Sequence, residues 1–386
     1  MMSVRERYAY FIVHRMLRLE EGEHLTLNVD EDCLDEAHTL AHEAANTSQV
    51  AVTMVTIRQG RVDGVDEIEP DGGRSLKARR EVLLHLAPFT PSRYDGAGEL
   101  DAPTLARHRL LADPIFLDRR LSIPYAVAYI PTASWAEFVY GPGESVDRLY
   151  LDLADFMNMD DEIRDDLSLT THRSLSMTAK RLEELDVERY SIVGEGIELT
   201  VYPASGAAPG PSSIALEGGR FFYPSLPCQD IAIPLDSRRG EGHIRSTRPF
   251  RFFDRLVEDV EMGIEGGRMK SFSGPDAQLV NSYINIDDQA SALGELVLCE
   301  ELTRAAGFRS AFGIPILDRM RTTGLVFGGA SPERITLCDE SKLEENGLNT
   351  SFARLEVPVG SRKMTVTAHT KDGRLVTVME DGRFRI

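Results

Sequence analysis

Residues 21–57 read EGEHLTLNVDEDCLDEAHTLAHEAANTSQVAVTMVTI, and this stretch decides the fold class. Segment 21–29 begins with a turn at a glycine and then alternates polar with apolar residues, which predicts a β-strand. Segment 33–48 has the composition of a helix, and the β-branched segment 49–57 predicts a second strand. A strand, a helix and a strand in this order favour a parallel sheet, because parallel strands need a crossover connection.

Further elements flank this unit on both sides. Residues 75–87, SLKARREVLLHLA, predict a helix, and residues 125–131, YAVAYIP, a short buried strand. Residues 145–159 and 171–185 again have helical spacing. Residues 3–19 predict an N-terminal helix with one apolar stripe, which consists of Tyr8, Phe11, Ile12, Met16 and Leu19.

The pattern changes after Leu185. Short β-like segments such as RYSIVG, IELTVYP, DIAIPL and KMTVTAH follow one another, separated by glycine, proline and aspartate. We therefore predict an α/β protein with two domains. The N-terminal parallel-sheet α/β domain spans 1–187, and a mainly antiparallel β-rich domain that carries the active-site cavity spans 188–386.

Charge and cysteine content narrow the partners and the compartment. The chain has a formal charge of −19, which disfavours nucleic acid and anionic membranes as partners. No apolar run approaches the roughly 18 residues of a membrane span, and the N-terminus lacks a signal-peptide pattern. The cysteines form no CxxC pair, so we expect reduced thiols and a cytoplasmic location. They are Cys33, Cys228, Cys299 and Cys338.

Common catalytic motifs are missing. His38 and His42 are spaced for a metal-binding helix face, but the glutamate of HExxH does not follow His38, so an ordinary helix surface is the better interpretation. The chain contains no P-loop, no GxGxxG and no nucleophile elbow.

Charged residues in apolar surroundings are the remaining candidates. Glu295 lies within DDQASALGELVL, where a semi-buried carboxylate needs a partner or a metal. Asp230 follows Cys228 in SLPCQDIAIP. Arg354 and Glu356, in SFARLEVPVG, lie two apart on a predicted strand and so point to the same face. An ordinary strand ion pair is the alternative interpretation of these two residues.

The order of several segments resembles the thermophilic metallo-aminopeptidases of the aminopeptidase T and S type, which are leucyl aminopeptidase-like. PTASWAEFVYGPG, GEGIELTV and GHIRSTRP are similar to family segments in the same order. DDQASALGELVL resembles TDEGAxxLGEVAL, ILDRMRTTGLVFGG resembles LFDENAxCHLALG, and SFARLEVPVG resembles SxxHxDFMIG. The resemblance implies a homodimer that encloses a cavity with two metal ions.

Most metal ligands implied by the resemblance are replaced in this chain. The glutamate of LGE is kept as Glu295, and PTEE becomes PCQD, which leaves Asp230 after Gln229. The first histidine position holds Gly324, and the HxD pair reads Arg354 and Glu356. His243 and His369, the other histidines of the C-terminal half, are interpreted as surface residues.

A guanidinium stays protonated and cannot coordinate a metal. We therefore predict no metal and no cofactor. Instead, we expect Arg354 to neutralise the carboxylates of Asp230, Glu295 and Glu356, because a buried carboxylate without a cation is costly.

Three functions remain open, and whether the protein is an enzyme is uncertain. The first is a metal-independent enzyme for an amide or amino-acid-like substrate in a specialised pathway, with a peptide-like or other small molecule as ligand. The second is a non-catalytic pseudoenzyme, a homodimer that binds or scaffolds; the third and weakest is a single-metal enzyme such as a ring-cleaving dioxygenase. Glu295, Arg354, Glu356 and Asp230 are the predicted catalytic residues. The predicted substrate-binding residues are Arg354, which would hold a carboxylate or an oxyanion, Gln229 and Cys228; Cys228 is also a weaker candidate nucleophile.

Overall fold

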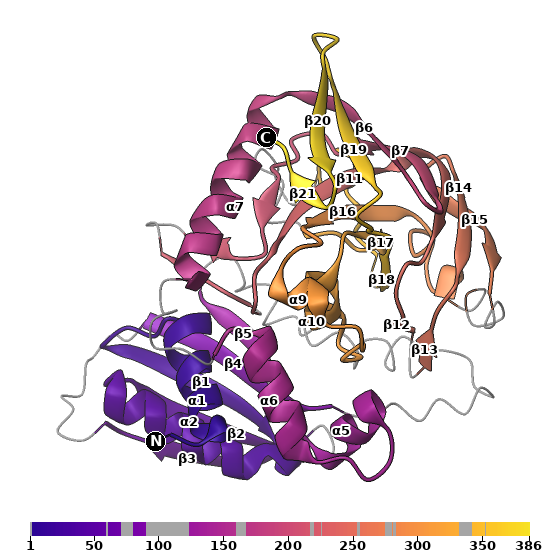
Figure 1. The fold of residues 1–386 in the computed structure, drawn as a ribbon. Coiled ribbons are helices and arrows are strands. Elements are labelled where there is room, and N and C mark those ends of the chain that lie inside the picture. Colours follow the sequence, from indigo (N-terminus) through magenta and orange to yellow (C-terminus); the bar gives the residue numbers. More distant parts are fainter. Residues whose placement is uncertain are drawn as a thin grey trace. The chain divides into compact units, whose positions relative to one another are not determined.

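The elements of the protein form two units, and each unit collects separate stretches of the chain (Figure 1). Residues of Met1–Pro91, Asp113–Ser168 and Ser213–Cys228 form the N-terminal unit, and those of Leu169–Ser212 and Gln229–Ile386 form the bulk of the C-terminal unit. The computed structural model describes residues 2–58, 61–70, 80–89, 123–159, 167–216, 220–224, 226–252, 255–274, 280, 283–331, 342–351 and 353–386.

The N-terminal unit is built on a five-stranded sheet of order β3-β2-β1-β4-β5. Neighbours among β1, β2, β4 and β5 run parallel, whereas the edge strand β3 pairs antiparallel with β2. The strands are β1 (Glu23–Asp30), β2 (Ala51–Arg58), β3 (Arg61–Ile68), β4 (Arg80–Pro88) and β5 (Tyr125–Ile130). The helices are α1 (Val4–Phe11), α2 (Leu34–Thr47), α5 (Ala133–Tyr140) and α6 (Val146–Phe156). This architecture confirms the α/β prediction.

Helix α1 starts where the sequence offers a cap. Ser3 and Glu6 form a capping box, in which each side chain accepts a hydrogen bond from the other residue's backbone N–H. The chain continues as a π-helix, Ile12–Met16, so the predicted apolar stripe stays on one side. The members of that stripe, Tyr8, Phe11, Ile12, Met16 and Leu19, are all buried.

The helix predicted over 75–87 is wrong for the residues that the structure describes. Residues 80–88 form β4, which lies between β1 and β5 in the middle of the sheet. The buried residues of β4 alternate along the strand, as Val82, Leu84 and Leu86, but Leu83 between them is also apolar, so the sequence shows a continuous apolar run at 82–84. Such a run cannot be distinguished from a buried helix by periodicity alone.

A later segment of the chain completes the N-terminal unit. Strands β9 (Ile214–Ala215) and β10 (Phe221–Phe222) pair antiparallel, and Ile214 and Phe222 pack against Tyr125 of β5. Between them Arg220 forms an ion pair with the fully buried carboxylate of Glu23. The division into domains 1–187 and 188–386 remains a prediction, and the contacts divide the chain at other points.

The C-terminal unit contains one large antiparallel sheet. Its main path has the order β18-β17-β16-β11-β7-β6-β19-β20-β21, and β8, β14 and β15 join beside β11. The site-bearing strands are β11 (Asp230–Arg245), β16 (Leu293–Cys299), β17 (Gly324–Gly328) and β18 (Arg354–Pro358).

The remaining strands of this unit are β6 (Val187–Gly194), β7 (Ile197–Pro203), β8 (Gly210–Pro211), β12 (Phe250–Phe252), β13 (Arg255–Val257), β14 (Glu261–Glu265), β15 (Arg268–Ser273), β19 (Thr365–Thr370), β20 (Leu375–Glu380) and β21 (Arg383–Phe384). Its helices are α9 (Arg304–Gly307) and α10 (Pro315–Asp318), together with most of α7 (Leu167–Glu184). The mainly antiparallel character predicted for the second half of the chain is confirmed.

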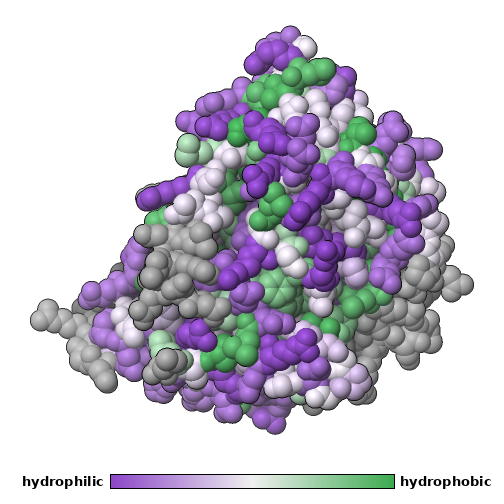
Figure 2. All heavy atoms as spheres, in the orientation of Figure 1, coloured by the Kyte–Doolittle hydropathy of each residue, from purple (hydrophilic) through white to green (hydrophobic). Residues whose placement is uncertain are grey.

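Hydrophilic residues cover most of the face in Figure 2, with hydrophobic residues interspersed among them. Within the described residues no helix combines the length and the apolar character that a membrane span needs. His38 and His42 are exposed on α2, as expected for an ordinary helix surface. Cys33, Cys228 and Cys299 are buried and not disulfide-bonded, whereas Cys338 lies outside the described residues.

Candidate functional site

The strand register gathers the predicted site residues on one face of the C-terminal sheet. Glu295 of β16 lies opposite Val326 of β17, and Val326 lies opposite Glu356 of β18. Directly opposed residues of antiparallel strands point to the same face, and so do residues two apart on one strand. Arg354 and Gly324 therefore share the face of Glu295 and Glu356.

Asp230 reaches this face from the next strand. Pro234 of β11 lies opposite Glu295, and Asp230 is four residues earlier on the same strand. Arg319 comes from a short 3-10 helix, Arg319–Arg321, that directly follows α10. The α10 turn is held by Asp318, whose carboxylate accepts hydrogen bonds from the backbone N–H groups of Phe312 and Gly313 at 2.8 Å each.

Five of these side chains form a line of alternating charges, which we call the ion chain: Asp230, Arg319, Glu356, Arg354 and Glu295. Arg319 Nη2 lies 2.7 Å from Asp230 Oδ2, and Arg319 Nη1 lies 3.5 Å from Glu356 Oε1. Arg354 Nε lies 2.8 Å from the same Glu356 Oε1, and its Nη2 lies 2.7 Å from Glu295 Oε2. The side chains of Asp230 and Glu295 are fully buried, and that of Arg354 is 20% exposed.

Almost every acceptor of the ion chain is occupied. Asp230 Oδ1 accepts a hydrogen bond from the Ser212 hydroxyl, and Glu295 Oε1 accepts one from the Ser331 backbone N–H at 2.6 Å. The exception is Glu356 Oε2, which is buried and has no hydrogen-bond donor among the described residues. A buried acceptor without a partner is rare and marks a place where a water, an ion or a ligand group belongs.

Opposite charges within the ion chain favour the ionised forms of Glu295, Arg319 and Arg354. Burial alone would raise the pKa of Glu295, but the charges of Arg354 and Arg319 outweigh it and lower the pKa to about 2. Burial would likewise lower the pKa of Arg319, whereas Asp230 and Glu356 raise it above its ordinary value. Glu295 and Glu356 raise the pKa of Arg354 in the same way, against burial. Glu295, Arg319 and Arg354 are therefore held in their charged forms.

The predicted pairing of Arg354 is confirmed, since it contacts both Glu295 and Glu356. It does not pair with Asp230, whose cation is Arg319. Sequence reasoning missed Arg319. The signal was present in ILDRMRTTG, where the family segment LFDENAxCH has a glutamate at the position of Arg319.

The other candidates lie at the start of β11 or away from the ion chain. Cys228 is buried, and its Sγ accepts a hydrogen bond from the Ser213 backbone N–H at 3.2 Å. Gln229 has a buried side-chain oxygen with no donor among the described residues. His243 is exposed, and His369 is hydrogen-bonded to the Ser191 hydroxyl at 2.8 Å. Catalytic and substrate-binding roles for the predicted residues remain predictions.

Comparison with known proteins agrees with this arrangement of sheets and segments. The sequence profile described as thermophilic metalloprotease (M29) matches residues 3–384. The chain belongs to this metalloprotease family. The resemblance inferred from the sequence segments is thereby confirmed.

Individual relatives are distant but match over most of their length. Aminopeptidase T from Thermus aquaticus is 24% identical over 96% of this chain and 95% of its own. Aminopeptidase 2 from Geobacillus stearothermophilus is 22% identical over 84% of this chain and 79% of its own. The solved structure of wild-type AmpT from Thermus thermophilus is similar in fold, with a TM-score of 0.80, 18% identity and 99% of both chains covered.

Membership of a metalloprotease family overturns the prediction that the protein has no cofactor. The prediction was wrong because it was made from the substituted positions alone, whereas the family and its aminopeptidase relatives imply metal ions.

The described side chains nevertheless do not fit such an ion as they are arranged. Each oxygen of Asp230 and of Glu295 already accepts a hydrogen bond, and among the described residues only Glu356 Oε2 of the ion chain has no donor. Zinc needs about four ligands, and arginine supplies none. The described part of the chain also contains no group of three or more His, Cys, Asp or Glu residues that could hold a metal. We therefore derive no chemical step through a metal.

Proposed function

We propose that this aminopeptidase-family protein binds the amino end of a peptide-like substrate at the ion chain, with Glu356 as the acceptor. The observation that carries the proposal is Glu356 Oε2, which is buried and has no hydrogen-bond donor among the described residues. Its neighbour Oε1 contacts both arginines, so the carboxylate is fixed in position. A substrate ammonium would supply the missing donor as a charge-assisted hydrogen bond.

The charge of the ion chain supports a cationic ligand group. Three carboxylates and two guanidinium groups leave a net charge of −1. An uncompensated charge in a buried site is costly, so a monovalent cation is favoured there. An α-ammonium group meets this need and adds three N–H donors.

Arg354 is suited to hold the substrate's carbonyl oxygen. A guanidinium carries five N–H donors. Three of those of Arg354 point to Glu356, Glu295 and the backbone oxygen of Gly329, and no described residue accepts from the other two. Donors fixed beside a carbonyl stabilise the oxyanion that develops during amide cleavage. Glu356 would then be the residue that holds or moves a proton.

The second candidate function is a non-catalytic protein that binds peptide-like ligands. The observation that favours it is that each oxygen of Asp230 and of Glu295 already accepts a hydrogen bond within the protein, so both carboxylates serve the structure of the ion chain. No observation favours the ring-cleaving alternative. For both candidates we propose a homodimer, as the family resemblance implies, and a cytoplasmic location, which the buried thiols of Cys33 and Cys299 support.

The test is calorimetric binding of leucyl-glycine and of its N-acetylated form, together with chromatographic detection of released leucine. Each assay is run with and without added zinc, cobalt or manganese. We expect the free dipeptide to bind and the acetylated one to bind at least about tenfold more weakly, since a missing partner for a buried polar group costs about 1–3 kcal/mol.

Glu356→Gln should remove this preference, whereas Glu261→Gln, at an exposed position on β14, should retain it. Release of leucine identifies an enzyme, and binding without release identifies the non-catalytic alternative. Equal affinity for the free and acetylated dipeptides in the unaltered protein would contradict the role of Glu356.

A further inference from the structure

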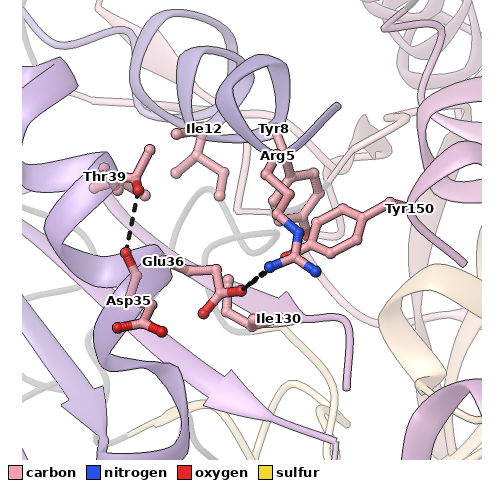
Figure 3. Close-up of a pocket in the computed structure, with 10 residues that line it drawn as sticks. Arg5, Tyr8, Ile12, Asp35, Glu36, Thr39, Ile130 and Tyr150 are labelled. Carbon is pink, nitrogen blue, oxygen red and sulfur yellow. Dashed lines mark hydrogen bonds and ion pairs between the residues drawn. The ribbon is translucent and has the colours of Figure 1, made fainter. Parts of the chain in front are cut away.

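A second candidate site lies in the N-terminal unit, in a pocket between α1, α2, the end of β5 and α6 (Figure 3). It is a small pocket, with a cavity volume of about 70 Å³. The pocket lies where β5 ends, at Ile130, and where α2 begins after β1. The carboxyl ends of parallel strands are the usual place for ligand sites in α/β sheets.

The floor of the pocket is apolar and aromatic. The rings of Tyr8 and Tyr150 meet edge to face, with centroids 5.9 Å apart. The Tyr8 hydroxyl is already committed, because it donates to the backbone oxygen of Tyr129 at 2.8 Å. Buried aliphatic side chains complete the floor, namely Ile12, Leu40 and Ile130. Such a floor accepts an aliphatic or aromatic group and offers little to a polar one.

Arg5 lies at the mouth of the pocket between two carboxylates and holds both loosely. Its Nη2 lies 3.7 Å from Asp147 Oδ1. Arg5 Nη1 lies 3.5 Å from Glu36 Oε1, and the Arg5 side chain is 52% exposed. In Figure 3 a dashed line joins the Arg5 guanidinium to the Glu36 carboxylate, and the Tyr150 ring lies beside the guanidinium. The Arg5 carbon Cζ lies 5.3 Å from the centre of that ring. Glu36 Oε1 also accepts a long hydrogen bond from the Tyr150 hydroxyl, at 3.4 Å. A charge-assisted hydrogen bond is typically about 2.7–2.9 Å long, so none of these contacts holds Arg5 or Glu36 tightly.

Separating a weakly held ion pair of this kind costs little free energy. Exposed ion pairs typically contribute about 0–1 kcal/mol. A ligand that brings a carboxylate to Arg5 and an ammonium to Glu36 replaces these long contacts by two close ion pairs. In a free amino acid these two groups are attached to the same carbon, so both can meet the paired charges at once. The third substituent of that carbon is then free to enter the pocket.

We propose that this pocket binds a free α-amino acid with an apolar side chain, such as leucine. The carboxylate of the ligand accepts two hydrogen bonds from the Arg5 guanidinium, and its ammonium donates to the Glu36 carboxylate. The side chain of the ligand packs against the Tyr8 and Tyr150 rings. The pocket is separate from the ion chain, which belongs to the other unit. The proposal therefore does not depend on the function proposed for Glu356.

Calorimetry with matched ligands tests the proposal directly. L-Leucine carries both charges, L-leucinamide lacks the carboxylate, 4-methylpentanoate lacks the ammonium, and L-serine lacks the apolar side chain. We expect leucine to bind and each of the other three to bind at least about tenfold more weakly, since each loses one set of contacts. The titrations are repeated in Glu356→Gln, where leucine binding at this pocket should persist.

Two variants assign the contacts. Arg5→Ala should lower the affinity for leucine to that for leucinamide and leave leucinamide nearly unchanged. Glu36→Gln should lower the affinity for leucine to that for 4-methylpentanoate. Arg148→Ala is the control, because Arg148 is a similarly exposed arginine on α6 that pairs with Glu144 at 2.9 Å. Absence of leucine binding, equal binding of the one-charge analogues, or an equal loss in Arg148→Ala would overturn the proposal.

Discussion

The ion chain of the C-terminal sheet and the Arg5–Glu36 pair of the N-terminal unit are built from the same two side-chain types in opposite settings. In the ion chain Arg354 lies 2.7 Å from Glu295, whose side chain is fully buried. In the pocket Arg5 lies 3.5 Å from Glu36 and is half exposed. Water competes for the second pair and is excluded from the first, so the interaction energies differ although the chemistry does not. Burial decides how tightly an arginine is held by its carboxylate partner.

The largest expected difference is in stability. Arg354→Ala should lower the free energy of unfolding by about 3–5 kcal/mol, because it leaves the buried Glu295 carboxylate without its cation. Arg5→Ala should change it by less than about 1 kcal/mol, because solvent already screens that pair. Urea unfolding of both variants measures the two values. Similar losses in the two variants would remove the distinction between the regions.

Acid unfolding sharpens the comparison. The pKa of Glu295 is lowered from 4.5 to about 2, so its contribution is fully present above pH 4.5 and is lost as the pH falls toward 2. The shift corresponds to about 3 kcal/mol. The stability difference between the unaltered protein and Glu295→Gln should therefore shrink by about that amount from pH 6 to pH 2.

Urea titrations at several pH values measure this change. In an Arg354→Ala background the same comparison should lose most of its pH dependence, because the first charge that lowers the pKa of Glu295 is gone. If the pH dependence is unaltered in that background, Arg354 is not its source.

The smallest expected effect comes from opening the ion chain to a metal. Arg354→His with Gly324→His frees Glu295 Oε2 and adds two imidazoles on the face of Glu356. The position of Gly324 tolerates a side chain, since an added Cβ would meet just the Val357 backbone oxygen, at 3.4 Å. We expect this double variant to bind zinc at least about tenfold more tightly than the parent, a difference of about 1.4 kcal/mol.

Calorimetry compares the double variant with Gly324→His alone, in which Arg354 still occupies Glu295 and little gain is expected. We expect no aminopeptidase activity from the double variant, because the groups that orient metal ligands are not restored by two substitutions. A folded double variant whose zinc affinity equals that of the parent would show that these positions do not converge on one site.

The spacing of apolar residues along the chain was sufficient to predict several helices and strands. The alternation in 21–29, the helix of 33–48 and the strand of 49–57 became β1, α2 and β2, because each is set by the period of its own apolar residues. The shared face of Arg354 and Glu356 also followed from spacing on one strand. The family resemblance then added Glu295 and Asp230 as neighbours of that pair.

Other features depended on contacts between segments far apart in the chain. Residues 80–88 are a strand because they lie between two parallel strands, and a helix would have had the same apolar content. Residues 213–228 join the N-terminal unit because Arg220 and Phe222 pair with Glu23 and Tyr125 there. An assignment from sequence order alone would place such a segment in the same domain as the elements that precede and follow it.

The sequence by itself determined the two types of sheet, the Arg354–Glu356 pair and the membership of a metalloprotease family. Only the tertiary structure decided that Arg319 is the cation of Asp230, because the two residues are 89 positions apart and Arg319 reaches the start of β11 from a 3-10 helix outside the sheet. It also decided that Glu356 keeps one acceptor vacant and that Arg5 stays loosely held. Sequence specifies which charges exist, whereas burial and distance, which depend on every packed neighbour, set what each charge does.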